Sequence, residues 1–343
     1  MKDIFFYLTL FVIVVFLGFA VKKLQKYFEQ PDEYHYIRNY LLNDSPLYNY
    51  NKPKIWIHSK FEVNARDWKQ DNFRNSTDLN QPYLNVCLKT IINHCSRDFH
   101  ICLIDDHSFA NLIPSWDIQM EHIKEPEKEQ YRNLGLTQLL YHYGGILLPN
   151  SFVCLSSLQP LYEQYENRIF FAEEVNRGVM NGNGKRDDFV AGLKIAHSPK
   201  QHPKLLEFID LQRNRLKTNF NSASFKLNNS NTQWIEEQWK GGEVDVLCGK
   251  LFGIKSKINK PIEIDEYLRS DFLPFDEQTT PLGLYIDGDE LLLREKYSWF
   301  AVLPEDELFD KDCIIVEYMK KSLVETSNIY YKDTKLPAKV SQL

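Results

Sequence analysis

The hydrophobic pattern begins with a long apolar run at the amino terminus. Ile4 to Val21 gives 18 positions without a charged residue. As a helix this run is about 27 Å long, which is enough to cross the hydrocarbon core of a bilayer. The sequence VKKLQKYFEQ that follows has no small-x-small cleavage site. Residues 1–30 therefore predict a retained single-pass anchor rather than a cleaved signal peptide.

The sequence does not determine on which side of the membrane the soluble domain lies. Three lysines shortly after the apolar run favour a cytosolic soluble domain. Asn-x-Ser/Thr triplets at Asn43, Asn75 and Asn228 would instead suit a lumenal domain. Residues 31–52 are polar and turn-prone and predict a stem. We expect a protein anchored in the endomembrane system or the plasma membrane, with its orientation unassigned.

From residue 53 onward the apolar positions alternate between strand spacing and helix spacing. Strand character is found in KIWIH and HICLI, and YLNVCLKTIINHC between them has apolar residues at helical spacing. Strand, helix and strand within about 50 residues form the unit of a parallel α/β sheet. A helix ending in YHY then runs through Gly144-Gly145 directly into the buried strand ILLP.

The second half of the chain continues this alternation. Two stretches with strand character, RIFFAEEV and DDFVAGLKIAH, flank a polar, glycine-rich loop. An amphipathic helix is predicted in HPKLLEFIDLQRNRL, a strand pair in EVDVLCGKLFGIKS, and a strand or hairpin followed by a helix in GLYIDGDELLLREKYSWFAVLPEDEL. We predict an α/β domain with a mostly parallel central sheet at 53–265 and a C-terminal extension packed on it at 266–343.

Composition narrows the class of protein. The 343 residues are 43% hydrophobic and 14% aromatic, which is ample for a packed core. A formal net charge of −6 argues against a general nucleic-acid-binding protein, because such binding needs a basic excess. The six cysteines include no Cys-x-x-Cys pair, so neither a zinc ribbon nor a redox dithiol is expected. They predict core thiols, with one or two disulfides if the domain lies in an oxidising compartment.

Polar side chains follow several predicted strands at the point where each strand ends. Ligands of open α/β sheets bind outside the carboxyl ends of the strands, so these residues are candidates for a binding site. They are His58, Asp105, Asp106, Asn150, Ser151, Glu173 and Glu174. Structural roles compete with this interpretation. Asp105-Asp106-His107-Ser108 also fits a loop with a helix N-cap at Asp106 or Ser108. The two glutamates also fit a solvated pair, and His58 also fits a structural histidine.

Four stretches occur in a recognisable order between residues 53 and 205: PKIWIH, LNVCLKTIINHCSRDFHICLIDD, RNLGLTQLLYHYGGILLP and FVAGLKIAHSPKQHP. This order resembles the capsular polysaccharide synthesis and sugar-binding Asp-x-Asp glycosyltransferases. The resemblance implies the Rossmann-like glycosyltransferase A fold and transfer of a sugar from a nucleotide-sugar donor. In that family a helix reading roughly Ser-Asp-x-x-Arg precedes the glycines. An Asp-x-Asp after the next strand holds a divalent metal, Mn²⁺ or Mg²⁺, on the diphosphate.

The chain departs from this family pattern in the donor site. The helical Asp falls near Asn133 and the strand acids fall on Pro149 and Ser151, whereas the two glycines are matched. Hard cations favour charged oxygen ligands, and Pro149 offers none. The candidate donor-binding residues are the strand-end residues His58, Asp105, Asp106, Asn150 and Ser151, together with Arg132, Asn133, Gly144 and Gly145 on the helix and glycine turn before the strand. Arg132 is next to Asn133 but not at the place of the family's arginine, which falls near Leu136.

Without a metal, cations and helix N-termini would have to neutralise the leaving diphosphate. Each cation of this chain also fits an ordinary surface charge, and the candidates are Arg132, Lys185, Arg186, Arg294 and Lys296. Trp299 lies close to Lys296 in sequence and could stack on an acceptor sugar. An inverting transfer needs a base for the acceptor hydroxyl, and the candidates are Glu173, Glu174, Asp187 and Asp188.

Three functional hypotheses follow. The first is a membrane-anchored glycosyltransferase that acts on a glycan or another hydroxyl acceptor without the usual metal ligands. The second is a catalytically inactive relative that binds a glycan or a protein. The third is a two-metal nuclease or phosphatase that uses Asp105-Asp106 and the one Asp-x-Asp of the chain, Asp287-Gly288-Asp289. The position of that Asp-x-Asp favours a turn with a helix N-cap over a displaced metal site.

Overall fold

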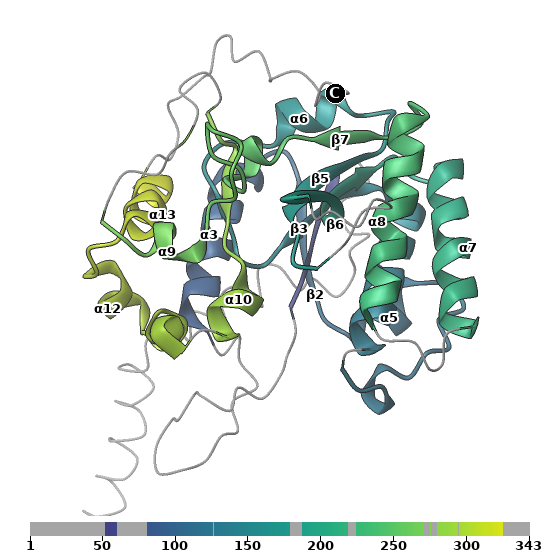
Figure 1. The fold of residues 1–343 in the computed structure, drawn as a ribbon, viewed down its shortest axis with the longest axis horizontal. Coiled ribbons are helices and arrows are strands. Elements are labelled where there is room, and N and C mark those ends of the chain that lie inside the picture. The colour runs from purple at the N-terminus through teal and green to yellow at the C-terminus, as the bar shows by residue number, and fades with distance from the viewer. Residues whose placement is uncertain are drawn as a thin grey trace, which may run out of the picture.

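The computed structural model describes residues 52–59, 81–125, 127–178, 187–218, 224–270, 275, 280–293 and 295–324 (Figure 1). The predicted anchor at 1–30 and most of the predicted stem lie outside these ranges. Among the helices within them, none combines the length and the apolar character needed to cross a membrane.

The described strands are β1 (Lys54–His58), β2 (His100–Ile104), β3 (Gly145–Pro149), β4 (Phe152–Cys154), β5 (Phe170–Val175), β6 (Phe189–Ser198), β7 (Asp245–Leu247) and β8 (Gly283–Tyr285). The longer helices are α3 (Pro82–Cys95), α5 (Glu127–Tyr143), α7 (Pro203–Thr218), α8 (Ser224–Lys240) and α13 (Ile314–Val324). Shorter helical segments are α4 (Ser108–Leu112), η1 (Met120–His122), α6 (Gln159–Gln164), η2 (Gly249–Phe252), α9 (Ile264–Tyr267), α10 (Gly288–Leu293), η3 (Glu295–Tyr297), α11 (Ser298–Val302) and α12 (Glu305–Phe309).

In the described part of the chain, six strands form one sheet in the order β2-β1-β3-β6-β5-β7. β1 pairs in parallel with β2 and β3, and β5 pairs in parallel with β7. β6 is antiparallel to both of its neighbours, so it runs against the other five strands. The predicted α/β fold with a mostly parallel central sheet is therefore confirmed. The reversal of β6 and the separate antiparallel pair β4–β8 are findings of the structure alone.

Helices cover both faces of this sheet. α3 lies on one face with the C-terminal helices, and α5, α7 and α8 lie on the other (Figure 1). The sequence of β1 accounts for the two layers. Ile55 and Ile57 pack into the core on the α3 side, and Trp56 packs into the core that includes α5, α7 and α8. Successive side chains of a strand point to opposite faces, so a strand that is covered on both sides is apolar throughout.

A glycine turn joins α5 directly to β3, as the sequence predicts. Gly144 and Gly145 have φ angles of 70° and 110°, a region that side-chain-bearing residues rarely adopt. A Cβ at Gly145 would lie 2.2 Å from the carbonyl oxygen of Lys54. The glycine pair thus lets β3 approach β1 closely, and the indole of Trp56 donates to the Gly144 carbonyl at 2.9 Å.

The C-terminal segments form a third core cluster against α3 and the β4–β8 pair. Phe300 of α11 and Met319 of α13 are fully buried in it, and Lys89 of α3 pairs with Glu305 of α12 at 2.8 Å. Two element predictions were wrong in detail. The strand pair expected in EVDVLCGKLFGIKS is one strand, β7, followed by the 3-10 turn η2. The single helix expected after β8 is a series of short helices from α10 to α12.

Candidate active site

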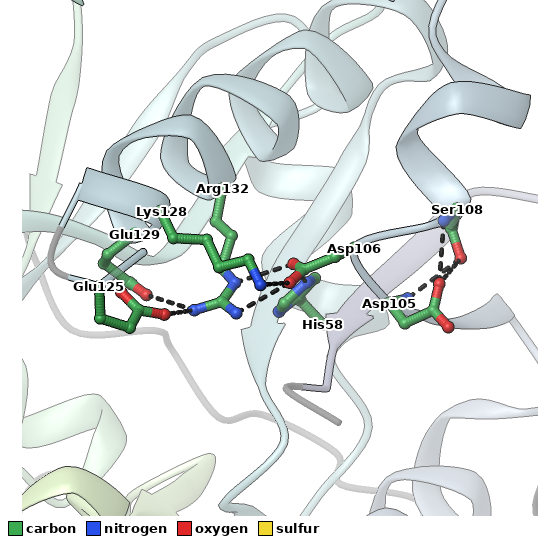
Figure 2. A network of polar contacts seen from close by, with 8 residues as sticks. All are labelled: His58, Asp105, Asp106, Ser108, Glu125, Lys128, Glu129 and Arg132. Carbon is green, nitrogen blue, oxygen red and sulfur yellow. Dashed lines mark hydrogen bonds and ion pairs between the residues drawn. The ribbon is translucent and has the colours of Figure 1, made fainter. Parts of the chain in front are cut away.

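The carboxyl ends of β1 and β2 bring three predicted site residues together. The His58 ring bonds Asp106 through Nε2 at 2.9 Å. Arg132 reaches across from α5 and donates to both carboxylate oxygens of Asp106, through Nε and Nη2, at 2.8 Å each (Figure 2). The His58 ring also stacks on Phe109, with centroids 5.6 Å apart. The prediction that strand ends would gather these polar side chains holds for this group.

Arg132 is surrounded by acids. Its side chain is 2% exposed and also pairs with Glu125 and Glu129 (Figure 2). Burial alone would raise the pKa of Asp106, but hydrogen bonds from Arg132 and His58 outweigh it and hold that pKa well below its usual range. A diphosphate would therefore compete with three carboxylates for this guanidinium. The ion pair between Arg132 and Asp106 therefore links α5 to the residues after β2.

Asp105, the neighbour of Asp106, is engaged in a local turn. Its Oδ1 accepts hydrogen bonds from the backbone N–H of Ser108 at 2.9 Å and from the Ser108 hydroxyl at 2.7 Å (Figure 2). The N-cap position of the short helix α4 is His107, whose side chain makes no capping hydrogen bond, so the alternative of a helix cap at Asp106 or Ser108 was wrong. Asp105 instead fixes the turn before α4.

The residues after β3 do not fit a divalent metal. Ser151 is 4% exposed, and its hydroxyl donates to the Ile286 carbonyl at 2.6 Å. Asn150 is half-buried and offers only a neutral amide oxygen. Across the described residues, no group of three or more His, Cys, Asp or Glu is placed to hold a metal ion. The donor set at this edge is therefore unsuited to Mn²⁺ or Mg²⁺, and no chemistry is assigned to a metal here.

A β-bulge in β6 interrupts the regular pairing of that strand with β5. Two consecutive residues of β5 pair with Ala196 and Gly192, which lie four positions apart on β6. A bulge leaves backbone groups outside the regular ladder. The N–H of Lys194 donates instead to Oε1 of Glu174 at 2.8 Å. The bulge therefore supplies the hydrogen bond that fixes the Glu174 carboxylate.

Gly192 leaves the space that this carboxylate occupies. A Cβ at Gly192 would lie 1.9 Å from Oε1 and 2.0 Å from Cδ of Glu174. Any larger residue would displace the glutamate side chain. The sequence stretch FVAGLKIAH thus contains both the glycine that accommodates Glu174 and the lysine that binds it.

Glu174 lines a pocket with a polar side and an apolar side. The pocket, together with the open solvent at its mouth, encloses about 410 Å³. Its charged and aromatic residues are Glu174, Arg177, Lys194, Tyr267, Tyr285 and Asp287. Its aliphatic residues are Val175, Ile254, Ile262 and Ile264. Two acids face two cations, so the lining has no formal net charge.

Contacts within the pocket fix its polar groups. The Lys194 ammonium donates to the Tyr285 hydroxyl at 2.8 Å and lies 5.2 Å from the centroid of that ring. Lys194 is an exposed residue, but partial desolvation of its ammonium beside Tyr285 would lower its pKa. Tyr285, Asp287 and Glu174 outweigh this effect and raise the pKa well above its usual value, so the group stays cationic. Burial raises the pKa of Glu174, and the negative charges of Asp287 and Glu129 act in the same direction.

Arg177 closes one side of the pocket. It pairs with Glu290 and lies 3.4 Å from Glu263 and 3.6 Å from Asp287, so it contacts the start of α9 and the start of α10. Asp287 also accepts a hydrogen bond from the backbone N–H of Glu290 at 3.2 Å. The predicted turn with a helix N-cap at the Asp-x-Asp is therefore confirmed, and its first acid lies in the pocket.

Glu173, one position before Glu174, has a different environment. Its carboxylate accepts hydrogen bonds from the Lys255 ammonium at 2.6 Å and from the Gly249 N–H at 2.8 Å, and the ion pair is almost fully buried. The alternative of a solvated Glu173-Glu174 pair was therefore wrong. Glu173 joins β5 to the segment after β7 and does not line the pocket.

The remaining predicted residues lie elsewhere. Asp187 and Asp188 are exposed before β6, outside the pocket lining, and their carbonyls accept hydrogen bonds from Asn176. Asn133 is half-buried on α5. Lys296 lies 3.5 Å from Asp265, and Trp299 packs against the third core beside Phe300. The candidate cations Lys185, Arg186 and Arg294 lie outside the described residues.

Several pocket residues were not among the predicted ones, including Arg177, Lys194 and Tyr285. Gly192, which leaves room for the Glu174 carboxylate, was not predicted either. One signal pointed to Lys194, because it is the charged residue within the otherwise apolar strand FVAGLKIAH. A charge in the middle of such a strand needs a partner or a cavity. Tyr285 and Arg177 carried no such signal.

Comparisons with known proteins give little further information. No protein-family model matches the chain, and no curated protein sequence matches it significantly. Among solved structures, the chain is similar to the apo-form glycosyltransferase GlyE of Streptococcus pneumoniae TIGR4, with 12% identity and a TM-score of 0.37. The match covers 79% of this chain and 64% of that chain, so this chain spans less than two thirds of the length of that protein. At this level of similarity the match carries no argument about activity.

Proposed function

We propose that this chain is a glycosyltransferase of the glycosyltransferase A type that transfers a sugar from a nucleotide-sugar donor to a hydroxyl acceptor without a metal. The observation that carries the proposal is the pocket beside the carboxyl end of β5, in which a carboxylate of raised pKa faces a fixed lysine and tyrosine. The order of sequence motifs and the mostly parallel sheet agree with this class of enzyme. The proposed anchor at Ile4 to Val21 keeps the site at a membrane.

The pocket lining suits a neutral sugar. A pyranose has hydroxyl groups around its edge and a face of C–H groups, so it needs hydrogen-bonding residues on one side and apolar residues on another. Glu174 and Asp287 can accept from hydroxyls, and Lys194 can donate to them. Three isoleucines and a valine form the apolar side. A lining without net charge favours a neutral ring over an anion.

Glu174 is the proposed general base. Its carboxylate would take the proton of the acceptor hydroxyl while that oxygen attacks the anomeric carbon and the bond to the nucleotide diphosphate breaks. A carboxylate whose pKa is raised is a stronger base for this proton. The hydrogen bond from the Lys194 N–H leaves one carboxylate oxygen without a backbone donor, and that oxygen would receive the proton. The Lys194 ammonium adds positive charge that favours the departing diphosphate.

A second function has one specific observation in its favour. The hydroxyl of Ser151 is turned away into the protein, toward the Ile286 carbonyl, at the position where the family keeps a metal-binding acid. A catalytically inactive domain that binds a glycan in the same pocket would tolerate this loss. The two functions share the sugar-binding pocket and differ in whether a nucleotide donor binds.

Calorimetric titration of the full-length chain in detergent micelles tests the proposal. The ligands are UDP, GDP, UDP-glucose, UDP-galactose and GDP-mannose, first with Mn²⁺ and then with EDTA. We expect binding of at least one donor that survives EDTA, because the described edge has no metal-ligand set. Binding that requires Mn²⁺ would contradict the metal-free mechanism. Absence of binding to all five nucleotide ligands would contradict the transferase proposal and favour the inactive alternative.

Two variants separate binding from chemistry. Glu174→Gln keeps the size and the hydrogen bond of the side chain but removes the base, so nucleotide release from the bound donor should fall at least about 100-fold with affinity little changed. Asp187→Asn is the matched control, because this acid is exposed and lies outside the pocket lining. Equal loss of activity in both variants would argue against Glu174 as the base.

A further inference from the structure

Two cysteine thiols are in contact in the hydrophobic core between α3 and β4. Sγ of Cys95 lies 3.8 Å from Sγ of Cys154, and both side chains are fully buried. Cys95 is the last residue of α3 and Cys154 is the last residue of β4, so the contact joins segments 59 positions apart. All six cysteines of the chain lie in the described residues, and this is the pair whose thiols are in contact.

Hydrogen bonds hold Cys154 in place from two sides. Its backbone N–H donates to the Thr90 hydroxyl of α3 at 2.9 Å. Its carbonyl accepts from the Ser322 hydroxyl of α13 at 2.6 Å. The Ser322 carbonyl in turn accepts from Asn93 of α3 at 2.8 Å. The backbone around Cys154 is therefore fixed against the helix that ends in Cys95.

We infer that Cys95 and Cys154 form a disulfide bond when the chain folds in the presence of a disulfide oxidant. A disulfide has its sulfurs about 2.05 Å apart, so closing the present contact takes a shift of under 2 Å, shared between two side chains. Cross-linking α3 to β4 would tie the central domain to the layer on which α13 packs.

The reaction balances with oxidised glutathione as the oxidant. The thiolate of one cysteine attacks glutathione disulfide, which forms a mixed disulfide and releases one glutathione thiolate. The thiolate of the other cysteine then attacks the protein sulfur of the mixed disulfide and releases the second glutathione. Two protein thiols lose two protons and two electrons, and one glutathione disulfide becomes two glutathione thiols.

Burial determines when this reaction occurs. In the folded chain, burial raises the pKa of Cys154 well above its usual value, and the thiol of Cys95 adds to this effect. The reactive form is the thiolate, so a folded, reduced chain should be oxidised slowly. The bond is therefore expected to form during folding, before the pair is covered. Slow oxidation of the native chain and fast oxidation during refolding is the kinetic pattern that this predicts.

Peptide mapping of the full-length chain tests the inference. The reduced, denatured chain is refolded in detergent with reduced and oxidised glutathione, acid-quenched, alkylated under denaturing conditions and cleaved with trypsin. We expect four alkylated cysteines and a linked pair of peptides, residues 90–97 and 133–168, each of which holds one cysteine. The refolded sample should also unfold at a temperature several degrees higher than the same sample after reduction.

Variants assign the bond. Cys95→Ser and Cys154→Ser should each abolish the linked peptides, whereas Cys102→Ser, another buried thiol, should keep them. The inference is overturned if the refolded wild-type chain has a cooperative thermal transition with all six cysteines alkylated, or if its linked peptides join other cysteines. Because the mapping is done on the wild-type chain, the result stands even where a variant folds poorly. It is also independent of whether the chain binds a nucleotide sugar.

Discussion

Replacing Gly192 by alanine should disable the pocket without unfolding the protein. The added Cβ would lie 1.9 Å from Oε1, 2.0 Å from Cδ and 2.5 Å from Cγ of Glu174. These distances are far below contact, so the glutamate must move. Its side chain is the flexible partner, whereas Gly192 is held in the sheet between β5 and the bulge. The backbone of Gly192 itself has no positive φ, so alanine is compatible with it.

The size of the effect follows from the hydrogen bond that is lost. A hydrogen bond to a charged group contributes about 1.5–3 kcal/mol, and the Lys194 N–H can bind water in its place at this exposed position. Exchange of glycine for alanine stabilises by about 0.4–1 kcal/mol through the unfolded state where the backbone allows it. We therefore expect stability to change by less than about 2 kcal/mol. A misplaced base should slow transfer by about 10- to 100-fold.

The assay is nucleotide release from the donor that binds, measured between pH 5 and 9, with urea unfolding of the same samples. In the wild-type chain the rate should decline on the acid side at a pH above the usual pKa of a glutamate, because burial raises the pKa of Glu174. In Gly192→Ala this acid limb should move to lower pH as the carboxylate moves toward solvent. The reasoning is refuted if the variant keeps both the wild-type rate and the wild-type pH profile. Ala191→Gly, at the adjacent position of β6, is a control without a Cβ clash.

Three further predictions concern stability. Lys255→Met should lower the free energy of unfolding in urea by about 3–5 kcal/mol, because it leaves Glu173 buried without its cation. The double variant Lys255→Met/Glu173→Gln should recover part of that loss, and absence of any recovery would contradict the ion pair. Burial lowers the pKa of His197 to about 4, so its contribution is present above its unfolded pKa near 6.5 and is lost as the pH falls toward 4. The wild-type chain should lose about 3 kcal/mol more than His197→Phe between pH 7 and pH 4, and parallel curves would argue against a neutral buried histidine. Hydrogen bonds from Arg132 and His58 hold the pKa of Asp106 below its usual value near 4, so the free energy of unfolding should fall as the pH drops below about 4. In Arg132→Met this loss should be smaller, which is measured as a smaller difference between the urea midpoints at pH 5 and pH 3.

The sequence predicts the layers of this fold better than its connections. Strand and helix periods identify β1, α3, β2, α5 and β3, because each carries a complete repeat of apolar positions. The direction of β6 has no such signature, since a buried strand has the same composition in either direction. β4 and β8 have three residues each, which is too short for a period to be visible.

One part of the candidate site could likewise be predicted from the sequence, and another part could not. Convergence of strand ends is a property of the sheet, so the proximity of His58 and Asp106 follows from topology. The pocket depends on the bulge in β6, and a bulge leaves no periodic trace in a sequence. Glu173 and Glu174 are alike in type and adjacent in sequence, yet only the pairing of β5 with its neighbours determines which one faces the pocket.

The opposite orientation of Glu173 and Glu174 limits how the length of β5 can vary. Side chains alternate between the two faces of a strand, so a one-residue insertion or deletion in β5 before the acids would move each of them to the opposite face. An insertion would place Glu173 over Gly192, whereas a deletion would place Glu174 beside Lys255. A two-residue change would keep each acid on its own face of the sheet. Length variants of this strand in related chains should therefore differ by even numbers, because an odd change moves Glu174 to the face away from the pocket.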